Sequence, residues 1–395
     1  MEPKIRLKGY SGDLVETTIK DLCEINPKSF LPDTFEYVDL ESVVGTEMIS
    51  HRTENKVGAP SRAQRLAKRG DIFYQTVRPY QKNNYLFDKD DTNFVFSTGY
   101  AQLRTKINNG YLFTLLQSSY FVNKVLLECT GTSYPAINPT NLSKIKVFII
   151  ENLQYQQCIS SYFKHLDILI QSTTKKIDSL KQIKIASLQS MFPQEGETKP
   201  RVRFKGFEEN WEKVPLNDFL EERNEKSRKT LEYPLMAFIA YKGVAPKGER
   251  YDRSALVNDV ENKIYKKTEY GDFIYSSNNL ETGSIGLNSY GKATISPVYS
   301  IFRCKDMIDF NFIGRRLICR DIINEMIKWR QGVIYGQWRI HEKDFLTINI
   351  LLPSYQEQTK IGDYFTNLDT QITLQTQRLE KLKQIKAACL DNMFV

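Results

Sequence analysis

The feature that most constrains this chain of 395 residues is an internal duplication. The segment from Tyr162 to Phe192 recurs from Tyr364 to Phe394 at a constant offset of 202 positions, and about half of the aligned positions are identical. Fainter matches extend the repeat into the longer segments before these, as between Gly70-Asp-Ile-Phe-Tyr and Gly271-Asp-Phe-Ile-Tyr. The chain therefore consists of two similar halves, each with a diverged larger segment followed by a closely matching one, which indicates one architecture used twice.

Apolar residues in the closely matching segments recur at alternating steps of four and three positions. In the first segment they are Ile159, Phe163, Leu166, Ile170, Ile177 and Leu180, and in the second Ile361, Phe365, Leu368, Ile372, Leu379 and Leu382. Such a narrow stripe is typical of a coiled-coil seam. We therefore predict a coiled-coil and subunit-interface role for ten of them: Phe163, Leu166, Ile170, Ile177, Leu180, Phe365, Leu368, Ile372, Leu379 and Leu382.

The two predicted long helices cover 153–192 and 354–395, with a linker at 193–200, because Pro193 stops the first helix. At ~1.5 Å per residue each helix is a rod of roughly 55 Å. Two equivalent stripes favour mutual antiparallel pairing, since each helix then buries the seam of the other. The alternative is that each helix packs only on its own domain.

The larger segments, 1–152 and 201–353, are each predicted to be a recognition domain with a mixed α+β fold. Both are rich in Tyr, Phe, Asn and Thr and contain short β-like runs such as Asn93-Phe-Val-Phe-Ser97. Helices are expected at 111–127 and 315–329. The fold class expected for the whole chain is α+β, with two tandem recognition domains separated by two long antiparallel helices related by a pseudo-twofold repeat.

Basic residues are concentrated locally in both recognition segments. Residues 52–106 hold eleven Lys and Arg against five Asp and Glu, and 242–267 hold seven against four. Lys and Arg suit DNA phosphates, whereas Arg, Asn and Gln suit base edges. The candidate DNA-binding residues are Arg62, Arg65, Lys68, Arg69, Gln75, Arg78, Lys82, Lys242, Lys247, Arg250, Arg253, Asn278, Asn279 and Lys292. For each of them a solvated basic loop is the alternative interpretation.

Composition favours an intracellular protein with a polyanionic partner. The formal net charge is +8, and the six cysteines include no Cys-x-x-Cys pair, which is typical of free thiols in a reducing cytoplasm. The first nine residues contain no apolar stretch, and no run approaches the ~20 apolar residues of a membrane span, so we expect neither a signal peptide nor a membrane helix.

The sequence lacks the motifs of a stand-alone catalyst. It contains neither Pro-Pro, which base-amino methyltransferases usually carry, nor Gly-x-Gly. The run Gly286 to Ala293 nearly spells a phosphate-binding loop, but Ala293 replaces the hydroxyl residue that holds magnesium, so a turn is the better interpretation. Asp33, Glu54 and Lys56 permit a nuclease interpretation, although Glu-x-Lys is frequent in a chain of this composition. The three histidines show no metal-ligand spacing.

The pattern resembles the specificity subunits of Type I restriction–modification systems. The resemblance covers essentially the whole chain and rests on three runs: Pro200-Arg-Val-Arg-Phe-Lys-Gly-Phe207 with Trp211-Glu212; Lys68-Arg-Gly-Asp-Ile-Phe with Val77-Arg78-Pro79; and Leu351-Leu-Pro-Ser-Tyr-Gln-Glu-Gln358 leading into the second helix. The first half departs from the pattern because no proline precedes Gln156-Gln157.

The resemblance implies a non-catalytic subunit that recognises double-stranded DNA. Each recognition domain would read one half of a bipartite target, while the helix pair sets the spacer and docks two modification (methyltransferase) subunits. Restriction and translocase subunits would complete the complex. This chain would bind no cofactor, since S-adenosylmethionine, ATP and Mg would belong to the partner subunits. The rival hypotheses are a stand-alone nuclease or methyltransferase and a coiled-coil adaptor that binds only protein.

Overall fold

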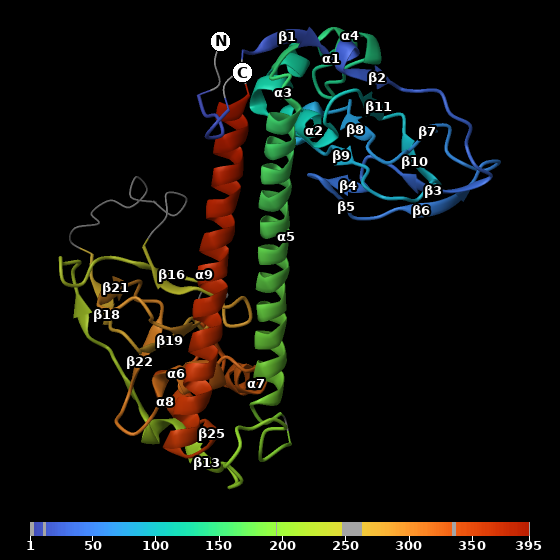
Figure 1. Cartoon of the computed structure of the whole chain (residues 1–395). Helices are drawn as coiled ribbons and strands as arrows, with labels where there is room; N and C mark the ends of the chain where they lie inside the picture. The colour runs from blue at the N-terminus through green and yellow to red at the C-terminus, as the bar shows by residue number, and fades with distance from the viewer. Residues whose placement is uncertain (1–3, 11–12, 195, 247–262, 334–336, 395) are drawn as a thin grey trace. The chain divides into compact units, whose positions relative to one another are not determined.

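The computed structural model of the chain describes residues 4–10, 13–194, 196–246, 263–333 and 337–394. The chain divides into two compact units (Figure 1). The first unit comprises Met1–Lys175 with Gln377–Val395, and the second comprises Lys176–Thr376. The two long helices, α5 (Leu153–Ser190) and α9 (Tyr355–Met393), each contribute to both units. The mixed α+β fold, the tandem organisation and the two long helices predicted from the sequence are confirmed.

The first unit contains short strands in four small sheets. β1 (Val15–Thr18) pairs antiparallel with β12 (Lys146–Ile149), and β4 (Val43–Val44) with β5 (Glu47–Met48). One four-stranded sheet has the order β2 (Cys23–Ile25), β11 (Tyr100–Thr105), β8 (Ile72–Gln75), β9 (Tyr85–Leu86). The other has the order β6 (Arg52–Asn55), β3 (Thr34–Val38), β10 (Phe94–Ser97), β7 (Ala63–Leu66), and there β10 and β3 run parallel.

The helix expected at 111–127 is two helices. The helical elements of this unit besides α5 and α9 are α1 (Ile19–Leu22), η1 (Pro79–Gln81), α2 (Asn109–Gln117), α3 (Ser119–Leu127) and α4 (Pro139–Lys144). Ser118 separates α2 from α3 because its backbone is extended, and its hydroxyl accepts a hydrogen bond from the Phe121 N–H at the start of α3 (3.2 Å). Serine is a preferred N-cap residue for this reason.

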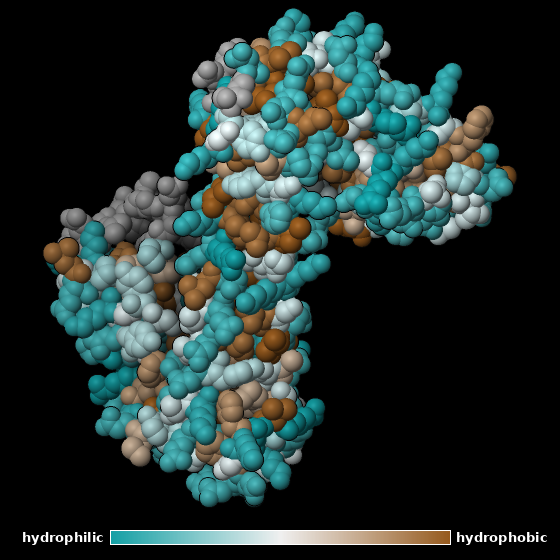
Figure 2. Space-filling view, in the orientation of Figure 1, coloured by the Kyte–Doolittle hydropathy of each residue, from teal (hydrophilic) through white to brown (hydrophobic). Residues whose placement is uncertain are grey.

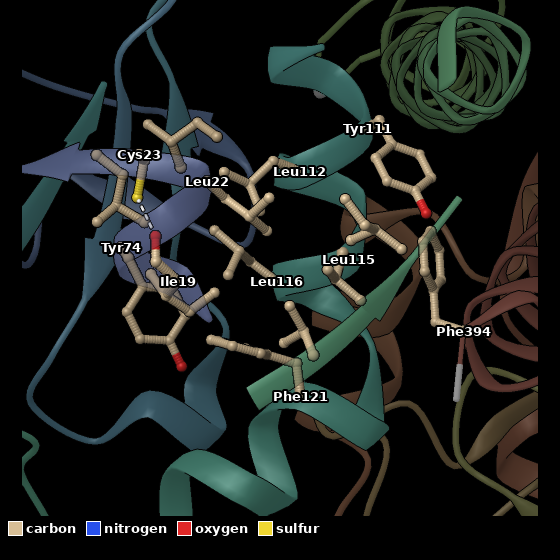
Figure 3. Packing of buried hydrophobic residues seen from close by; sticks show 14 of the residues in the cluster. Ile19, Leu22, Cys23, Tyr74, Tyr111, Leu112, Leu115, Leu116, Phe121 and Phe394 are labelled. Carbon is tan, nitrogen blue, oxygen red and sulfur yellow. Dashed lines mark hydrogen bonds between the residues drawn. The ribbon is translucent and has the colours of Figure 1, made fainter. Parts of the chain in front are cut away.

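The end of the second long helix is built into the core of the first unit. Phe394 lies beside Tyr111 of α2, with ring centroids 5.7 Å apart (Figure 3). Both residues belong to a buried cluster with Leu112, Leu115 and Phe121. Figure 3 also shows the Cys23 thiol donating to the carbonyl oxygen of Ile19 (3.1 Å). The first unit therefore has a core that needs residues from both ends of the sequence.

The second unit repeats much of this topology. β13 (Glu212–Pro215) pairs with β25 (Asn349–Leu352) as β1 pairs with β12. One four-stranded sheet corresponds to β2–β11–β8–β9 of the first unit. Its order is β14 (Leu220–Glu222), β22 (Ser300–Cys304), β19 (Phe273–Tyr275), β20 (Ile285–Leu287). The remaining strands are β15 (Lys226–Ser227), β18 (Tyr265–Thr268) and β21 (Ala293–Ile295) in one sheet, the pair β16 (Ala237–Ile239) and β17 (Gly243–Ala245), and the pair β23 (Gln331–Val333) and β24 (Gln337–Arg339).

The helix expected at 315–329 is also two helices. The helical elements of this unit are η2 (Leu216–Asp218), α6 (Phe310–Arg316), α7 (Arg320–Lys328) and α8 (Glu342–Leu346). Asp309 starts α6 earlier than expected, since its carboxylate accepts a hydrogen bond from the Phe312 N–H (2.8 Å). An extended Cys319 then interrupts the helical run.

Within each unit, the parts of α5 and α9 run antiparallel. In the first unit the Tyr162 hydroxyl lies 3.5 Å from the Cys389 sulfur, and the Asp167 carboxylate pairs with Lys386 (2.5 Å), so the numbering rises on one helix and falls on the other. In the second unit Lys184 pairs with Asp369 (2.5 Å), which is the same ion pair at the offset of the repeat. The alternative that each helix packs only on its own domain is therefore wrong.

The ten residues predicted for the helix seam are all buried or partly buried. Phe163, Leu166, Ile177, Leu180, Phe365, Leu368 and Leu379 are buried, and Ile170, Ile372 and Leu382 are partly buried. Thr173 occupies the position of the first seam between Ile170 and Ile177 where an apolar residue is missing. It is also buried, and its hydroxyl donates to the Leu169 carbonyl oxygen (2.6 Å). A satisfied hydroxyl is tolerated in a seam, because burial without a partner is what makes a polar group costly.

Candidate nucleic-acid interface

Three segments of the first unit meet in what we call the first loop face. They are the turn 45–46 between β4 and β5, the loop 76–84 after β8, and the loop 130–136 between α3 and α4. The side-chain oxygen of Asn83 accepts a hydrogen bond from the Gly45 N–H (2.8 Å). The Arg78 N–H donates to the Pro135 carbonyl oxygen (2.7 Å). These bonds join loops that are far apart in the sequence, so the three segments form one surface.

Gln75 holds the loop 76–84 from the inside. Its side chain is 3% exposed; its amide nitrogen donates to the Gln81 side-chain oxygen (2.9 Å), and its own side-chain oxygen accepts from the Asn83 N–H (3.2 Å). The predicted contact of Gln75 with DNA is disfavoured by this placement, because its side-chain polar atoms are buried and already paired. It lies at the end of β8, whose residues are all buried, and it supports the residues that reach the surface.

The first loop face presents cations and aromatic rings. The Arg78 guanidinium lies 4.3 Å from the centroid of the Tyr134 ring, and Tyr134 is 63% exposed. Tyr80 is also exposed, and Lys82 is partly buried, with its ammonium group 3.5 Å from the Ser119 hydroxyl. Burial lowers the pKa of Lys82. Arginine above an aromatic ring is a common and favourable pairing.

The second unit builds an equivalent surface, the second loop face, from corresponding segments. They are the turn 240–242 between β16 and β17, the loop 276–284 after β19, and the described part of the hairpin 331–339. The Tyr241 N–H donates to the Gly283 carbonyl oxygen (3.0 Å). The Asn278 side-chain oxygen accepts a hydrogen bond from the Trp338 N–H (2.6 Å).

The contents of the second loop face differ from those of the first. The predicted residues Lys242, Asn278 and Asn279 are exposed and come together there. Tyr241 (84% exposed) and Trp338 (49% exposed) lie beside them. The sequence reasoning missed these two aromatic residues and Tyr134. The available signal was that each is one to three residues from a glycine or proline.

The comparisons with known proteins agree with the duplicated architecture. A family model described as the Type I restriction modification DNA specificity domain matches residues 12–182 and again 208–384, which together are most of the chain. The chain belongs to this family. It carries two specificity domains in tandem, and each match runs from a larger segment into the long helix that follows it.

Individual relatives add detail. The chain is 29% identical over 164 residues to the Type I restriction enzyme HindI specificity subunit of Haemophilus influenzae, a match that covers 40% of this chain and only 35% of that relative. A crystal structure of the Type I restriction–modification S subunit of M. genitalium covers 100% of this chain and 99% of its own, at 15% identity and a TM-score of 0.64. A chain from a structure titled for the assembly and conformational transition of the type I R-M system covers 96% and 98%, at 20% identity and a TM-score of 0.53.

Other predicted DNA-binding residues of the first specificity domain lie outside the three segments of its loop face. Arg62 and Arg65 are on or next to β7, and Lys68 and Arg69 are in the turn that follows it. Arg69 pairs with Asp90 (2.7 Å) and with Asp88 (3.4 Å). Burial lowers the pKa of Arg65. These four cations therefore lie on other segments than Arg78 and Lys82, although all six are close in sequence.

In the second specificity domain Lys292 is paired with Glu232 (2.5 Å) in the turn before β21, outside the three segments of the second loop face. Lys247, Arg250 and Arg253 lie outside the described residues. The run Gly286 to Ala293 connects β20 to β21, whereas a phosphate-binding loop leads from a strand into a helix. A phosphate-binding loop is therefore excluded, and the turn interpretation is correct.

The aspartates of the two Gly-Asp motifs serve the fold. Asp71 is 1% exposed and forms a bidentate pair with Arg104 (2.9 and 2.8 Å). Asp272 is likewise buried and lies 2.9 Å from the Arg223 side chain. Burial raises the pKa of Asp272 even though Arg223 opposes the shift. Both carboxylates fix the turn before a central strand of their domain.

Within the described ranges, no group of three or more His, Cys, Asp or Glu side chains is placed to hold a metal ion. Of the residues of the nuclease interpretation, Glu54 is paired with Arg52 (2.8 Å).

Figure 2 shows hydrophilic residues over much of the visible surface of each unit. None of the helices that the structure describes has the length and apolar character of a membrane span.

Proposed function

We propose that this chain is the non-catalytic DNA-recognition subunit of a Type I restriction–modification complex. Each loop face reads one half of a two-part target in double-stranded DNA. The observation that carries the proposal is the pair of equivalent loop faces. Corresponding segments build both, yet one presents Arg78 and Tyr134 while the other presents Asn278, Asn279 and Trp338. A shared frame with different contents suits the reading of two unlike half-sites.

The chemistry of these faces supports a DNA ligand. Arginine can donate two hydrogen bonds to guanine, and asparagine can pair with the edge of adenine in the major groove. Lys82 and Lys242 add positive charge next to these groups, which suits phosphate contacts. Since phosphate contacts release counterions, we expect the affinity for DNA to fall steeply with salt.

The helix pair supports the second part of the proposal, in which it sets the spacer between half-sites and docks two methyltransferase subunits. Within each unit a seam and an ion pair hold the helices in one antiparallel register. Restriction and translocase subunits complete the complex in the cytoplasm. S-adenosylmethionine, ATP and Mg belong to these partners, and this chain binds none of them.

The test is to map N6-methyladenine in DNA from cells that contain the chain with its modification subunit. The control cells contain the modification subunit alone. We expect a two-part asymmetric motif that appears only with the chain. A methylation pattern independent of the chain, with assembly of the complex demonstrated, would refute the proposal and favour an adaptor that binds only protein.

A further inference from the structure

We propose that Arg78 reads a guanine in the half-site of the first specificity domain, and that Tyr134 holds its guanidinium in the reading position. This inference rests on the proposed function, since it assigns one base to one residue of the first loop face. It is carried by the backbone of the loop, by the contacts of the guanidinium, and by the absence of a competing carboxylate.

The backbone around Arg78 is strained and well fixed. Arg78 has φ 55° and ψ 55°, and Lys82, on the other side of η1, has φ 55° and ψ 30°. Among the described residues other than glycine, five have positive φ, and three of these, Arg78, Lys82 and Tyr241, lie in the two loop faces. Strain of this kind persists only where the surrounding structure enforces it, and it gathers at functional sites. Here the Pro135 carbonyl oxygen and the buried Gln75 enforce it.

The guanidinium of Arg78 has a ring as its partner, whereas three other arginines of the first unit have carboxylates. In the same unit, Arg52, Arg69 and Arg104 pair with Asp39, Asp88 and Asp71 respectively, among others. Arg78 has no carboxylate partner in the part of the chain that the structure describes. Its cationic group lies 4.3 Å from the centroid of the exposed Tyr134 ring.

This arrangement lets the guanidinium donate to the edge of a base. An aromatic ring holds the guanidinium but accepts none of the in-plane hydrogen bonds that its N–H groups donate. Two parallel donors match O6 and N7 of guanine in the major groove, which is the commonest specific contact of arginine with DNA. A phosphate also accepts two parallel hydrogen bonds from arginine, but such a contact carries no sequence information, so base preference in the methylated motif distinguishes the two.

The experiment compares variants of the chain assembled with its modification subunit. Arg78→Ala removes the donors, Arg78→Lys keeps the charge without the bidentate geometry, and Tyr134→Leu removes the ring. Arg52→Ala is the matched control. Arg52 also lies over a ring, that of Tyr37 at 4.8 Å, but it is paired with Asp39 and Glu54 (both 2.8 Å).

We expect the methylated motif of Arg78→Ala and Arg78→Lys to lose its preference for guanine at one base pair of one half-site. The discrimination at that base pair should fall roughly 5- to 150-fold, and the other half-site should stay unchanged. Tyr134→Leu should weaken the same preference to a smaller degree. Arg52→Ala should leave the motif as it is.

Two results would overturn the assignment. If Arg78→Ala lowers methylation evenly at all targets and flattens the salt dependence of binding while Arg78→Lys restores both, Arg78 contacts a phosphate. If the motif and its efficiency do not change in any variant, Arg78 lies outside the interface. Continued reading of the other half-site shows that a variant is folded and assembled. Failure of the proposed function gives a different result from both of these, because the chain without any substitution would then direct no methylation.

Discussion

Single glycines determine whether the loop faces can form. Gly131 has φ +88°, and a Cβ there would lie 3.0 Å from the Tyr134 carbonyl oxygen. Gly283 has φ +85°, and a Cβ there would lie 2.5 Å from the ring of Tyr241. Only glycine adopts this backbone region without cost. Each glycine therefore positions an exposed aromatic residue of its loop face.

Gly283→Ala should disturb the second loop face, because it combines an unfavourable φ with a clash against Tyr241. We expect a loss of about 1–3 kcal/mol in the free energy of unfolding. Methylation mapping should show weakened reading of one half-site only. Gly58→Ala is the control, since a Cβ at Gly58 meets nothing within 4 Å. Equal effects of the two substitutions would contradict this account.

Asp71→Asn should destabilise the first specificity domain without removing a DNA contact. The carboxylate accepts hydrogen bonds from the Lys68 N–H, from Gln102 and from Arg104. Removing its charge leaves the Arg104 guanidinium, 32% exposed, without its hydrogen-bonded counter-charge. We expect a loss of about 2–3 kcal/mol in the free energy of unfolding, measured by chemical denaturation. Asp88→Asn, at a carboxylate that is 53% exposed, should cost clearly less.

At the scale of elements, repeated ion pairs fix the register of the helices within each unit. Asp167–Lys386 and Lys184–Asp369 occupy equivalent positions of the repeat. Their surroundings differ, since Asp369 also pairs with Arg315 (2.6 Å) and Asp167 has no corresponding arginine among the described residues. Equivalent ion pairs of the sequence repeat therefore contribute differently to stability.

Reversing the charge at these pairs tests the register. Lys386→Asp should lower the stability of the first unit by about 0.5–1 kcal/mol, because the pair is partly exposed. The swap Asp167→Lys with Lys386→Asp should restore most of it. Lys184→Asp should cost less than Lys386→Asp, because Arg315 still compensates Asp369. Thermal unfolding of the three variants checks the order, and failure of the swap to restore stability would argue against a specific pair.

At the scale of the whole molecule, both specificity domains depend on both long helices. Phe394, at the end of the chain, lies in the core of the first unit, and Phe192, at the end of α5, lies in the core of the second. The Ile5 N–H donates to the Asn392 carbonyl oxygen in the first unit as the Val202 N–H donates to the Ser190 carbonyl oxygen in the second (3.0 and 2.9 Å). Neither domain is complete without the helix that follows the other.

Deleting one heptad from each long helix, residues 170–176 and 372–378, tests the proposed role in spacing. The deletion keeps the seam in phase and shortens each helix by roughly 10 Å. We expect the same two half-sites with a spacer shorter by about three base pairs, at ~3.4 Å each. Methylation mapping gives both quantities at once. An unchanged spacer in an assembled variant would disprove that the helix pair sets the distance between the half-sites.

The duplication, the two long helices, the mixed fold and the family could all be predicted from the amino-acid sequence, because they depend on spacings between nearby residues and on matches between segments. The tertiary structure alone decided which polar residues share a surface. It placed Gln75 inside, paired Arg69 with Asp90, and brought Arg78 onto Tyr134 from a distant loop. These outcomes follow from contacts between segments far apart in the chain, and local periodicity carries no information about such contacts.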